Sequence, residues 1–436
     1  MGALEIGYAS IAGIVISLYI GVPIVVALAG ASFLGIYFIR DDFEIATSVI
    51  SIAASETIAS YVFGVIPLFV LMGMLVNAAG VGRDTFAAAN QIFKRIAGGL
   101  GIATVAANAI FASVTGVSIA SAAVFTRVAV PEMVNAGYDS RFAVGIVAGS
   151  SILGMLIPPS LLLIVFAVLT EQSIGALFIA AIIPGIIMAV VFSIGIVVMV
   201  LRNPKLVGGN FHSASSFESY SVGELLRMMF PIVMLVTLIM GGIYGGFYTA
   251  TEAGGIGAFA ALVLAFAKRA LTPRKFWHIL VETGHITAAI CLVVIAAGMY
   301  SRMLALSGVP MTIGNWFVET DMSLPLSLFY YLSIIVLMGS ILDSMSIMLI
   351  IVPLAFPVFM NFGVDPIWFG IITIVAVEIG IITPPFGIGC FVVKDSLTDK
   401  SISLEDVFRG AIPFVALMLG VLVLLAMFPY LSLALL

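Results

Sequence analysis

Two proline pairs, Pro158-Pro159 and Pro384-Pro385, stand inside long apolar segments that otherwise read as helix. Because proline removes a backbone donor and disrupts a helix interior, each pair predicts a stretch of unwound backbone. Two further breaks are predicted at residues 113–116 (Ser-Val-Thr-Gly) and 339–343 (Gly-Ser-Ile-Leu-Asp). Unwound carbonyl groups away from water need a partner, which a cation and nearby hydroxyl groups can supply. The N–H groups that begin the next half-helix favour an anion. The chemistry indicated is therefore ion binding.

The composition places these breaks in a lipid bilayer. The 436 residues are 62% hydrophobic and only 9% charged, whereas a soluble domain carries about 25% charged residues. Several apolar runs, such as residues 179–201 and 411–436, exceed the roughly 20 residues that cross a membrane. Spanning β-strands show short alternating segments instead. We therefore expect an all-α polytopic membrane protein.

Residues typical of enzymes are sparse. Cys291 and Cys390 both lie in apolar segments, and the three histidines are scattered without a ligand-spaced pair. No nucleotide-binding loop, Ser–His arrangement or metal motif is present, and no nucleic-acid partner is expected. Apart from the cation expected at the breaks, no metal site or cofactor is expected, and the protein is not predicted to be an enzyme.

The apolar pattern divides the chain into four regions. Residues 1–64 are predicted to form N-terminal scaffold helices, and residues 65–201 a first repeat. Residues 202–285 add scaffold helices and charged segments at 219–229 and 272–283 that suit the membrane interface. Residues 286–436 form a second repeat. In each repeat we expect a broken helix followed by a re-entrant hairpin, with hairpin tips near residues 157–160 and 382–386.

The two repeats share residues at a constant offset of 226 positions. Eight identities fall within about thirty positions, more than chance predicts for this composition: Pro131/Pro357, Asn135/Asn361, Gly137/Gly363, Asp139/Asp365, Ile146/Ile372, Gly154/Gly380, Pro158/Pro384 and Pro159/Pro385. Five crossings are predicted between the two hairpins, namely residues 175–201, 231–245, 251–267, 286–306 and 328–360. An odd number inverts the second copy, and inverted repeats with interrupted helices are typical of secondary transporters.

Lysine and arginine set the expected orientation. Lys94, Arg95, Arg202, Lys205, the four cations at 268–275, Lys400 and Arg409 fall on one side of this topology. The positive-inside rule assigns that side to the cytoplasm, which puts both chain ends outside.

The motifs together resemble those of the large membrane subunit of tripartite ATP-independent periplasmic (TRAP) transporters. They are Gly-Val-Pro at 21–23, Pro-Leu-Phe-Val-Leu-Met-Gly at 67–73, Ala-Val-Pro-Glu-Met at 129–133, Ile-Pro-Pro-Ser at 157–160, Thr-Glu-Ala-Gly-Gly at 251–255 and Ile-Thr-Pro-Pro-Phe-Gly at 382–387. The resemblance covers essentially the whole chain, in order and length.

This resemblance implies sodium-driven symport of an organic acid across the bacterial inner membrane by an elevator movement. The acid would be a C4-dicarboxylate, a sialic acid or another carboxylate. Both broken helices and both hairpins would form the transport domain, and the other helices the scaffold. The partners implied are a small four-helix membrane subunit and a periplasmic substrate-binding protein. No four-helix block precedes Met1, so we expect the small subunit to be a separate chain.

Repeat symmetry suggests which residues bind sodium. The first candidate site joins Ser113, Thr115 and Gly116 to Gly154, Ile157 and Pro158. The second joins Gly339, Asp343 and Ser344 to Gly380, Thr383 and Pro384. The competing interpretation is that these small residues only allow helices to pack closely.

The carboxylate of the solute is expected at Arg127, Ser160, Pro159 and Pro385. A charge within a membrane helix is costly and is a functional candidate by default, but Arg127 could instead pair with Glu132 or reach water. Ser160 could cap its half-helix rather than touch the solute. Asp343 could bind sodium or pair with a cation, and Glu378 could brace the second hairpin.

The alternative within transport is a stand-alone inverted-repeat carboxylate symporter or ion antiporter that acts without partner subunits. A channel or a purely structural subunit explains neither the repeat nor the proline pairs.

Overall fold

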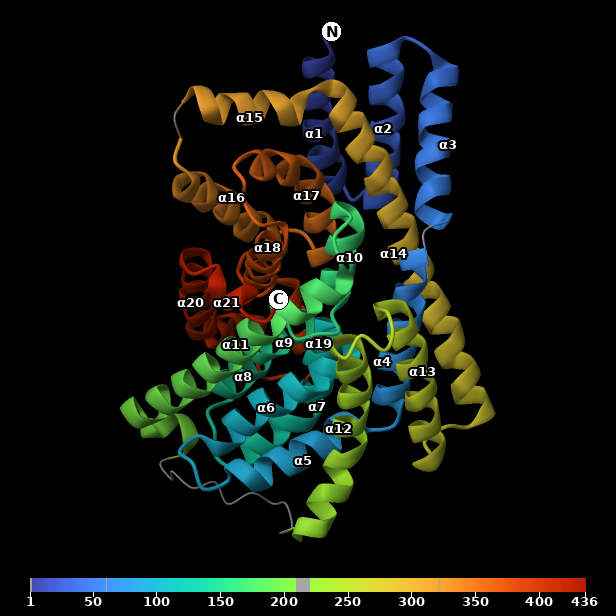
Figure 1. Cartoon of the computed structure of the whole chain (residues 1–436). Coiled ribbons are helices and arrows are strands. Elements are labelled where there is room, and N and C mark those ends of the chain that lie inside the picture. The colour runs from blue at the N-terminus through green and yellow to red at the C-terminus, as the bar shows by residue number, and fades with distance from the viewer. Residues whose placement is uncertain (1, 60, 209–219, 321) are drawn as a thin grey trace.

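The computed structural model describes residues 2–59, 61–208, 220–320 and 322–436, and all regular structure in these ranges is helical (Figure 1). The chain begins with α1 (Ala3–Tyr19), α2 (Ile24–Arg40), α3 (Phe43–Ala59) and the 3-10 helix η1 (Tyr61–Gly64). The prediction that the chain is an all-α polytopic membrane protein is confirmed.

Two sets of helices follow. The first comprises α4 (Val65–Ala78), α5 (Val81–Phe93), α6 (Gly99–Thr115), α7 (Ser118–Asn135), α8 (Ser140–Ser151), α9 (Leu153–Leu156), α10 (Leu161–Thr170) and α11 (Ile174–Arg202). The 3-10 helix η2 (Pro204–Val207), α12 (Val222–Tyr244) and α13 (Ala250–Ala267) connect it to the second. That set comprises α14 (Pro273–Ser307), α15 (Val309–Glu319), α16 (Leu324–Gly339), α17 (Ser344–Asn361), α18 (Pro366–Gly380), α19 (Ile388–Ser396), α20 (Leu404–Met427) and α21 (Tyr430–Leu433).

Six of the described helices are long and apolar enough to cross a membrane, or up to eight when two bent pairs each count as one span. Two predicted boundaries are wrong. The charged segment 272–283 is the first part of the 35-residue helix α14, so the boundary between 285 and 286 falls inside a helix. Residues 222–229 likewise begin α12, while Ser219 lies outside the described residues. A helix satisfies its own backbone, so it continues from the interface into lipid without a break.

The two sets match at the predicted offset of 226 residues. Helix α7 runs from Ser118 to Asn135 and α17 from Ser344 to Asn361. Asp139 and Asp365 each cap the next helix by accepting two backbone N–H groups. In Figure 1 the path from α8 to α10 runs upward and the path from α18 to α19 runs downward, so the second copy is inverted.

The segments predicted to be broken helices are re-entrant hairpins in the structure, and the segments predicted to be hairpins are broken helices. Rings of Phe111 and Phe125 lie 5.6 Å apart, so α7 folds back against α6. Tyr331 and Phe359 lie 5.0 Å apart across α16 and α17, although 28 residues of continuous helix would separate them by about 40 Å. These pairs are the re-entrant hairpins.

The proline pairs instead interrupt spans that continue. The helix pair Ser140–Leu156 and Leu161–Thr170 is bent by only 41° at its break. Glycine rather than proline permits the reversal in the first hairpin, because Gly116 adopts φ +65, where other residues are strained. Five crossings still separate the two hairpins. The span α8–α10 is the first of them, and residues 328–360, predicted to be the fifth, belong to the second hairpin instead.

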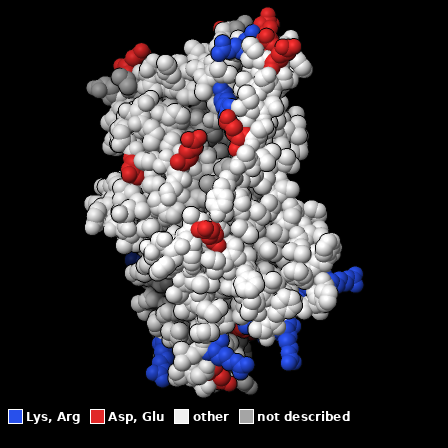
Figure 2. Space-filling view, turned by 45° about the vertical axis from the view of Figure 1, so that its right-hand side comes forward, with Lys and Arg blue, Asp and Glu red and all other residues white. Residues whose placement is uncertain are grey.

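Basic residues gather at one end of the molecule, the lower end in Figure 2. Several segments that carry these basic residues contact one another at this end. Lys268 pairs with Asp84, Lys275 donates to the Ala78 carbonyl at 3.2 Å, and Gln91 donates to the Tyr220 carbonyl. The N-terminus lies at the opposite end (Figure 1). The clustering agrees with the expectation that lysine and arginine gather on one side. The C-terminus, expected on the opposite side with the N-terminus, lies near mid-height in Figure 1.

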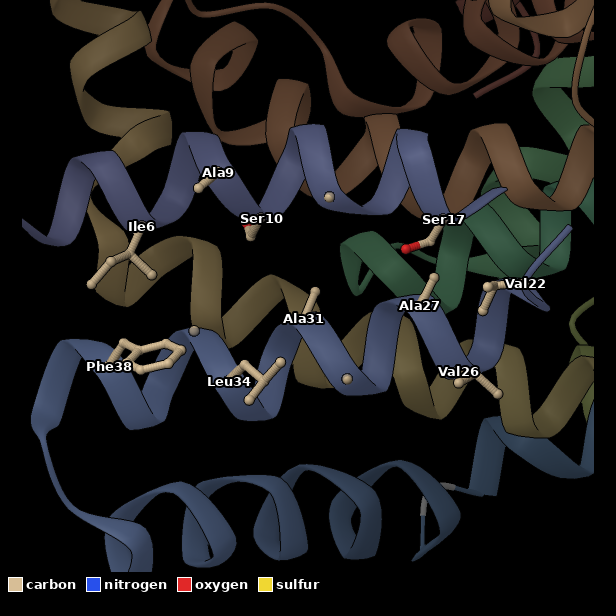
Figure 3. A pocket seen from close by; sticks show the side chains of 13 residues that line it. Ile6, Ala9, Ser10, Ser17, Val22, Val26, Ala27, Ala31, Leu34 and Phe38 are labelled. Carbon is tan, nitrogen blue, oxygen red and sulfur yellow. The ribbon is translucent and has the colours of Figure 1, made fainter. Parts of the chain in front are cut away.

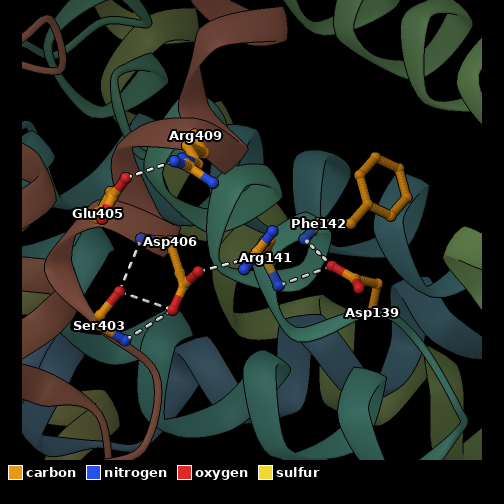
Figure 4. Close-up of polar contacts among 7 residues, drawn as sticks. All are labelled: Asp139, Arg141, Phe142, Ser403, Glu405, Asp406 and Arg409. Atoms are coloured by element: carbon orange, nitrogen blue, oxygen red, sulfur yellow. Dashed lines mark hydrogen bonds and ion pairs between the residues drawn. The ribbon is translucent and has the colours of Figure 1, made fainter.

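An ion pair joins the starts of α8 and α20 (Figure 4). Arg141 Nε lies 2.6 Å from Asp406 Oδ1, and the other Asp406 oxygen accepts from Ser403 in a capping box. The helices then touch backbone to backbone, since a methyl group on Gly145 would come within 2.1 Å of the Gly410 carbonyl oxygen. Small residues of this kind let membrane helices approach closely.

We predict that Gly145→Ala destabilises the chain by about 1–3 kcal/mol, because the added methyl forces α8 away from α20. The matched control is Gly420→Ala on α20, where a methyl meets no atom within 4 Å. The midpoint of thermal unfolding in detergent measures the difference. Equal midpoints for the two variants would contradict the close contact.

Candidate ion and solute site

The tip of the first hairpin lies against the break between α9 and α10. The Leu161 N–H donates to the Gly116 carbonyl at 3.2 Å. A methyl group on Gly116 would come within 2.6 Å of the Pro159 carbonyl oxygen, and one on Gly154 within 2.9 Å of Ser118 Cα. The structure thus brings together the two halves of the first predicted sodium site.

Oxygen atoms are abundant at this contact. The Ser113 and Thr115 hydroxyls donate to the carbonyls of Ile110 and Phe111 at 2.6 and 3.0 Å, which leaves their lone pairs free. Within the described chain no hydrogen bond ends on the carbonyls of residues 157–159. Unpaired carbonyls and hydroxyl lone pairs are the ligands that a hard cation prefers. The arrangement suits a sodium ion.

The second hairpin tip meets the second break in the same way. The Phe386 and Gly387 N–H groups donate to the Ser340 carbonyl at 3.0 and 3.2 Å. Gly339 and Gly380 pack backbone to backbone, since a methyl group on Gly339 would come within 2.7 Å of Gly380 Cα. These contacts bring Gly339 and Gly380 of the second predicted set together. The Thr383 hydroxyl donates within its own segment, to the Ile379 carbonyl at 2.6 Å.

Asp343 acts first as a helix cap. One of its carboxylate oxygens accepts from the Met345 and Ser346 N–H groups at 3.1 and 3.2 Å. The other accepts from the Ser346 hydroxyl. No described lysine or arginine pairs with it, so the alternative of a cationic side-chain partner receives no support.

The two breaks differ in exposure. Pro158, Pro159 and Ser160 are buried, whereas Pro384, Pro385 and Phe386 are exposed, the last to 53%. The peptide bond within each proline pair is cis. Only the second break therefore offers its prolines to a ligand in this conformation.

The side chains expected to bind a carboxylate are not gathered at one place. The Ser160 hydroxyl is buried and donates to the Met155 carbonyl; it also accepts from Leu163 N–H at 3.4 Å, so it caps α10. Arg127 is exposed on α7, nine residues beyond Ser118, or about 13 Å along the helix. No described residue forms an ion pair with Arg127.

Sequence reasoning named Glu378 and Ser344 but missed Ser118, which lies beside the Glu378 carboxyl group. The Ser344 hydroxyl donates to Glu378 Oε1 at 3.0 Å, so Glu378 braces the second hairpin as one interpretation proposed. The Ser118 hydroxyl lies beside the same carboxyl group without good hydrogen-bond geometry. Ser118 and Ser344 are themselves 226 residues apart, so the repeat offset could have identified Ser118.

Two surface grooves are not part of this region. One of about 410 Å³ lies between α1 and α2 and is lined mainly by apolar side chains such as Leu34 and Phe38 (Figure 3). The other, about 920 Å³, lies over α16, α18 and α20 and is also mainly apolar. Grooves of this composition suit lipid chains rather than a charged solute.

Comparison with known proteins supplies the family context. Residues 11–431 match a family described as "Tripartite ATP-independent periplasmic transporter, DctM component". The chain is 33% identical over 390 residues to the C4-dicarboxylate TRAP transporter large permease protein of Pseudomonas aeruginosa, covering 88% of each. It is 31% identical to the sialic acid TRAP transporter large permease protein of Vibrio cholerae, covering 85% of each.

A solved structure shares the fold. The Neisseria gonorrhoeae protein MtrF, titled as one of a class of antimetabolite efflux pumps, aligns with a TM-score of 0.65 over 98% of this chain and 95% of its own. At 12% identity this likeness concerns the architecture alone.

We predict that Gly116→Ala destabilises the chain by about 1–3 kcal/mol more than Gly80→Ala. Both glycines have positive φ, but only Gly116 lies against another backbone segment, while Gly80 has open space around it. The Gly80→Ala control therefore has the backbone strain of a positive φ but no steric clash with another segment. Thermal unfolding of both variants in detergent measures the difference, and equal losses would show that tip and break do not touch.

Proposed function

Since the chain belongs to the DctM-component family of TRAP transporters, we propose that it is the subunit that carries an organic acid across the bacterial inner membrane by sodium symport. The observation that carries the proposal is the pairing of each hairpin tip with a helix break, Gly116 with Leu161 and Ser340 with Gly387. Interrupted helices at matched positions of inverted repeats form the ion and substrate sites of secondary transporters.

Sodium would bind where tip and break meet. The ligands proposed are carbonyls and hydroxyls of the two sets described above, from Ser113 to Pro158 and from Gly339 to Pro384. Without an ion the carbonyls of residues 157–159 have no described donor, which is costly in a dry interior. A bound ion would therefore favour the assembled tip and break, and that preference is the physical basis of coupling.

The solute would be a carboxylate that binds beside the second break, where Pro385 is exposed. The relatives named for C4-dicarboxylate and sialic acid transport support an organic acid. Arg127 would offer a cation for its carboxylate. Pro159 and Ser160 are buried here, so contact with the solute would require the first break to open in another conformation.

Movement and assembly complete the proposal. Hairpins α6–α7 and α16–α17, with spans α8–α10 and α18–α19, would move as one body against α1–α4 and α12–α14. A small four-helix membrane subunit would join the scaffold, and a periplasmic binding protein would deliver the solute. The phrase "large permease protein" in the relatives' names supports a smaller partner. The basic end would face the cytoplasm.

We predict that proteoliposomes containing the chain, its small subunit and its binding protein accumulate the organic acid only with an inward sodium gradient. Radiolabelled uptake with sodium outside is compared with uptake when potassium replaces sodium. Equal uptake in both would remove sodium coupling. Equal uptake by this chain alone, without partners, would favour the stand-alone transporter.

We also predict that Arg127→Ala reduces uptake at least about tenfold by raising the half-saturating solute concentration, since a charge-assisted contact to a carboxylate is worth about 1.5–3 kcal/mol. The matched control is Arg95→Ala, another exposed arginine without a described ion pair. Full transport by the Arg127 variant would exclude the assigned contact, and loss in both variants would indicate an effect of surface charge.

A further inference from the structure

Glu378 is an acidic side chain buried in the membrane interior. It lies on α18 shortly before the second break and is 1% exposed. Its Oε1 accepts from the Ser344 hydroxyl at 3.0 Å, but its Oε2 has no hydrogen-bond partner. An ionised carboxylate in such a place is strongly unfavourable unless a bound proton neutralises it or an opposite charge compensates it.

The protein supplies no such charge by an ion pair. None of the described lysines, arginines or histidines pairs with Glu378. Among the helices packed against α18, the charged side chains are Arg202 at the end of α11 and three residues near the start of α20. The latter three already pair with Arg141 or with each other.

A second unsatisfied group faces the same carboxyl. Ser118 is 2% exposed, and its hydroxyl lies beside Glu378 without a hydrogen-bond partner. Ser118 and Ser344 are the first residues of α7 and α17, the returning arms of the two hairpins. Glu378 therefore lies where the tips of both repeats converge.

The partial positive charges of nearby helix N-termini compensate only part of a negative charge on Glu378. A helix N-terminus carries roughly half a positive charge, but the Asp343 carboxylate already caps α17. The start of α7 has no side-chain cap. The Ser118 hydroxyl and Glu378 Oε2 still have no hydrogen-bond partner, and the lone pairs of both oxygens are available to coordinate a cation.

We propose that Glu378 Oε2 and Ser118 Oγ are ligands of a monovalent cation held between the two repeats. Ser344 is a positioning residue that holds the carboxyl group through Oε1. Sodium has the preference for oxygen ligands that this pair requires. The inference rests on the proposed sodium coupling and adds a charged ligand to sites otherwise built from carbonyls and hydroxyls.

The location gives this ion a function in coupling. Ser118 belongs to the first hairpin, whereas Glu378 and Ser344 belong to the second repeat. An ion between them joins the two repeats and neutralises the carboxylate before the domain moves through lipid. Without the ion, the domain would have to carry the charged Glu378 carboxylate through lipid, which is unfavourable.

The first test is the sodium dependence of thermal unfolding of the full chain in lipid nanodiscs. Sodium chloride is varied, and choline chloride keeps the ionic strength constant. For Glu378→Gln, which keeps the shape but loses the charge, the half-maximal sodium concentration should rise about tenfold or more. The control Glu405→Gln alters an exposed pair on α20 and should leave that concentration unchanged.

A second variant decides the outcome if Glu378→Gln does not fold. Ser118→Ala removes a buried hydroxyl that has no partner, so without sodium it should be as stable as the unaltered chain or more so. Its half-maximal sodium concentration should nevertheless rise several-fold. The matched control is Thr126→Val, which removes another buried, unpartnered hydroxyl eight residues further along α7, or about 12 Å away.

The results separate the two proposals. No sodium dependence in the unaltered chain would overturn sodium coupling itself. Sodium dependence that persists unchanged in both Glu378→Gln and Ser118→Ala would leave sodium coupling intact and overturn the cation site at Glu378. Its carboxyl would then be held by Ser344 and the helix ends alone.

Discussion

The contact of a hairpin tip with a helix break, backbone against backbone, is the constraint on which the rest of this structure depends. Gly116 lies against Pro159, and Gly339 against Gly380, at distances that exclude even a methyl group. Such contact leaves little room for water, so polar backbone groups must pair across it or remain unpaired. Leu161 N–H and Gly387 N–H find carbonyls on the opposite tip. The carbonyls of residues 157–159 accept no hydrogen bond within the described chain, and they are the ligands proposed for the cation.

The two copies of this contact are related by the repeat but are not chemically the same. Ser160 caps α10 and closes the first break from within. The position 226 residues later is Phe386, which is exposed and cannot cap. The capped break is buried and the uncapped break is exposed. In an inverted repeat, asymmetry of this kind gives the two sides of the membrane unequal access to the centre.

The distribution of charged side chains also reflects the cost of placing polar groups in the dry interior. The ion pair of Arg141 and Asp406 lies at the solvent-exposed starts of two helices, where water lowers its cost. Among the described residues, the interior keeps one fully buried carboxyl group, Glu378, between hydroxyls of both hairpins. Its retention in a dry interior costs stability, and that cost favours a functional role for it.

The amino-acid sequence alone determined the class of membrane protein, the repeat, its inversion and several of the residues that meet at each proposed ion site, because hydropathy, proline and glycine act locally and symmetry pairs them. It misassigned the hairpins, since a proline pair breaks a helix without setting the angle between its halves. Only the packing of Phe111 on Phe125, far apart along a straight helix, decided that α6 and α7 fold back. Tertiary structure likewise brought Ser118 to Glu378. Ser118 and Glu378 belong to different repeats, so only the global fold brings them together. The local preferences of the sequence for helix or turn do not determine the distance between them.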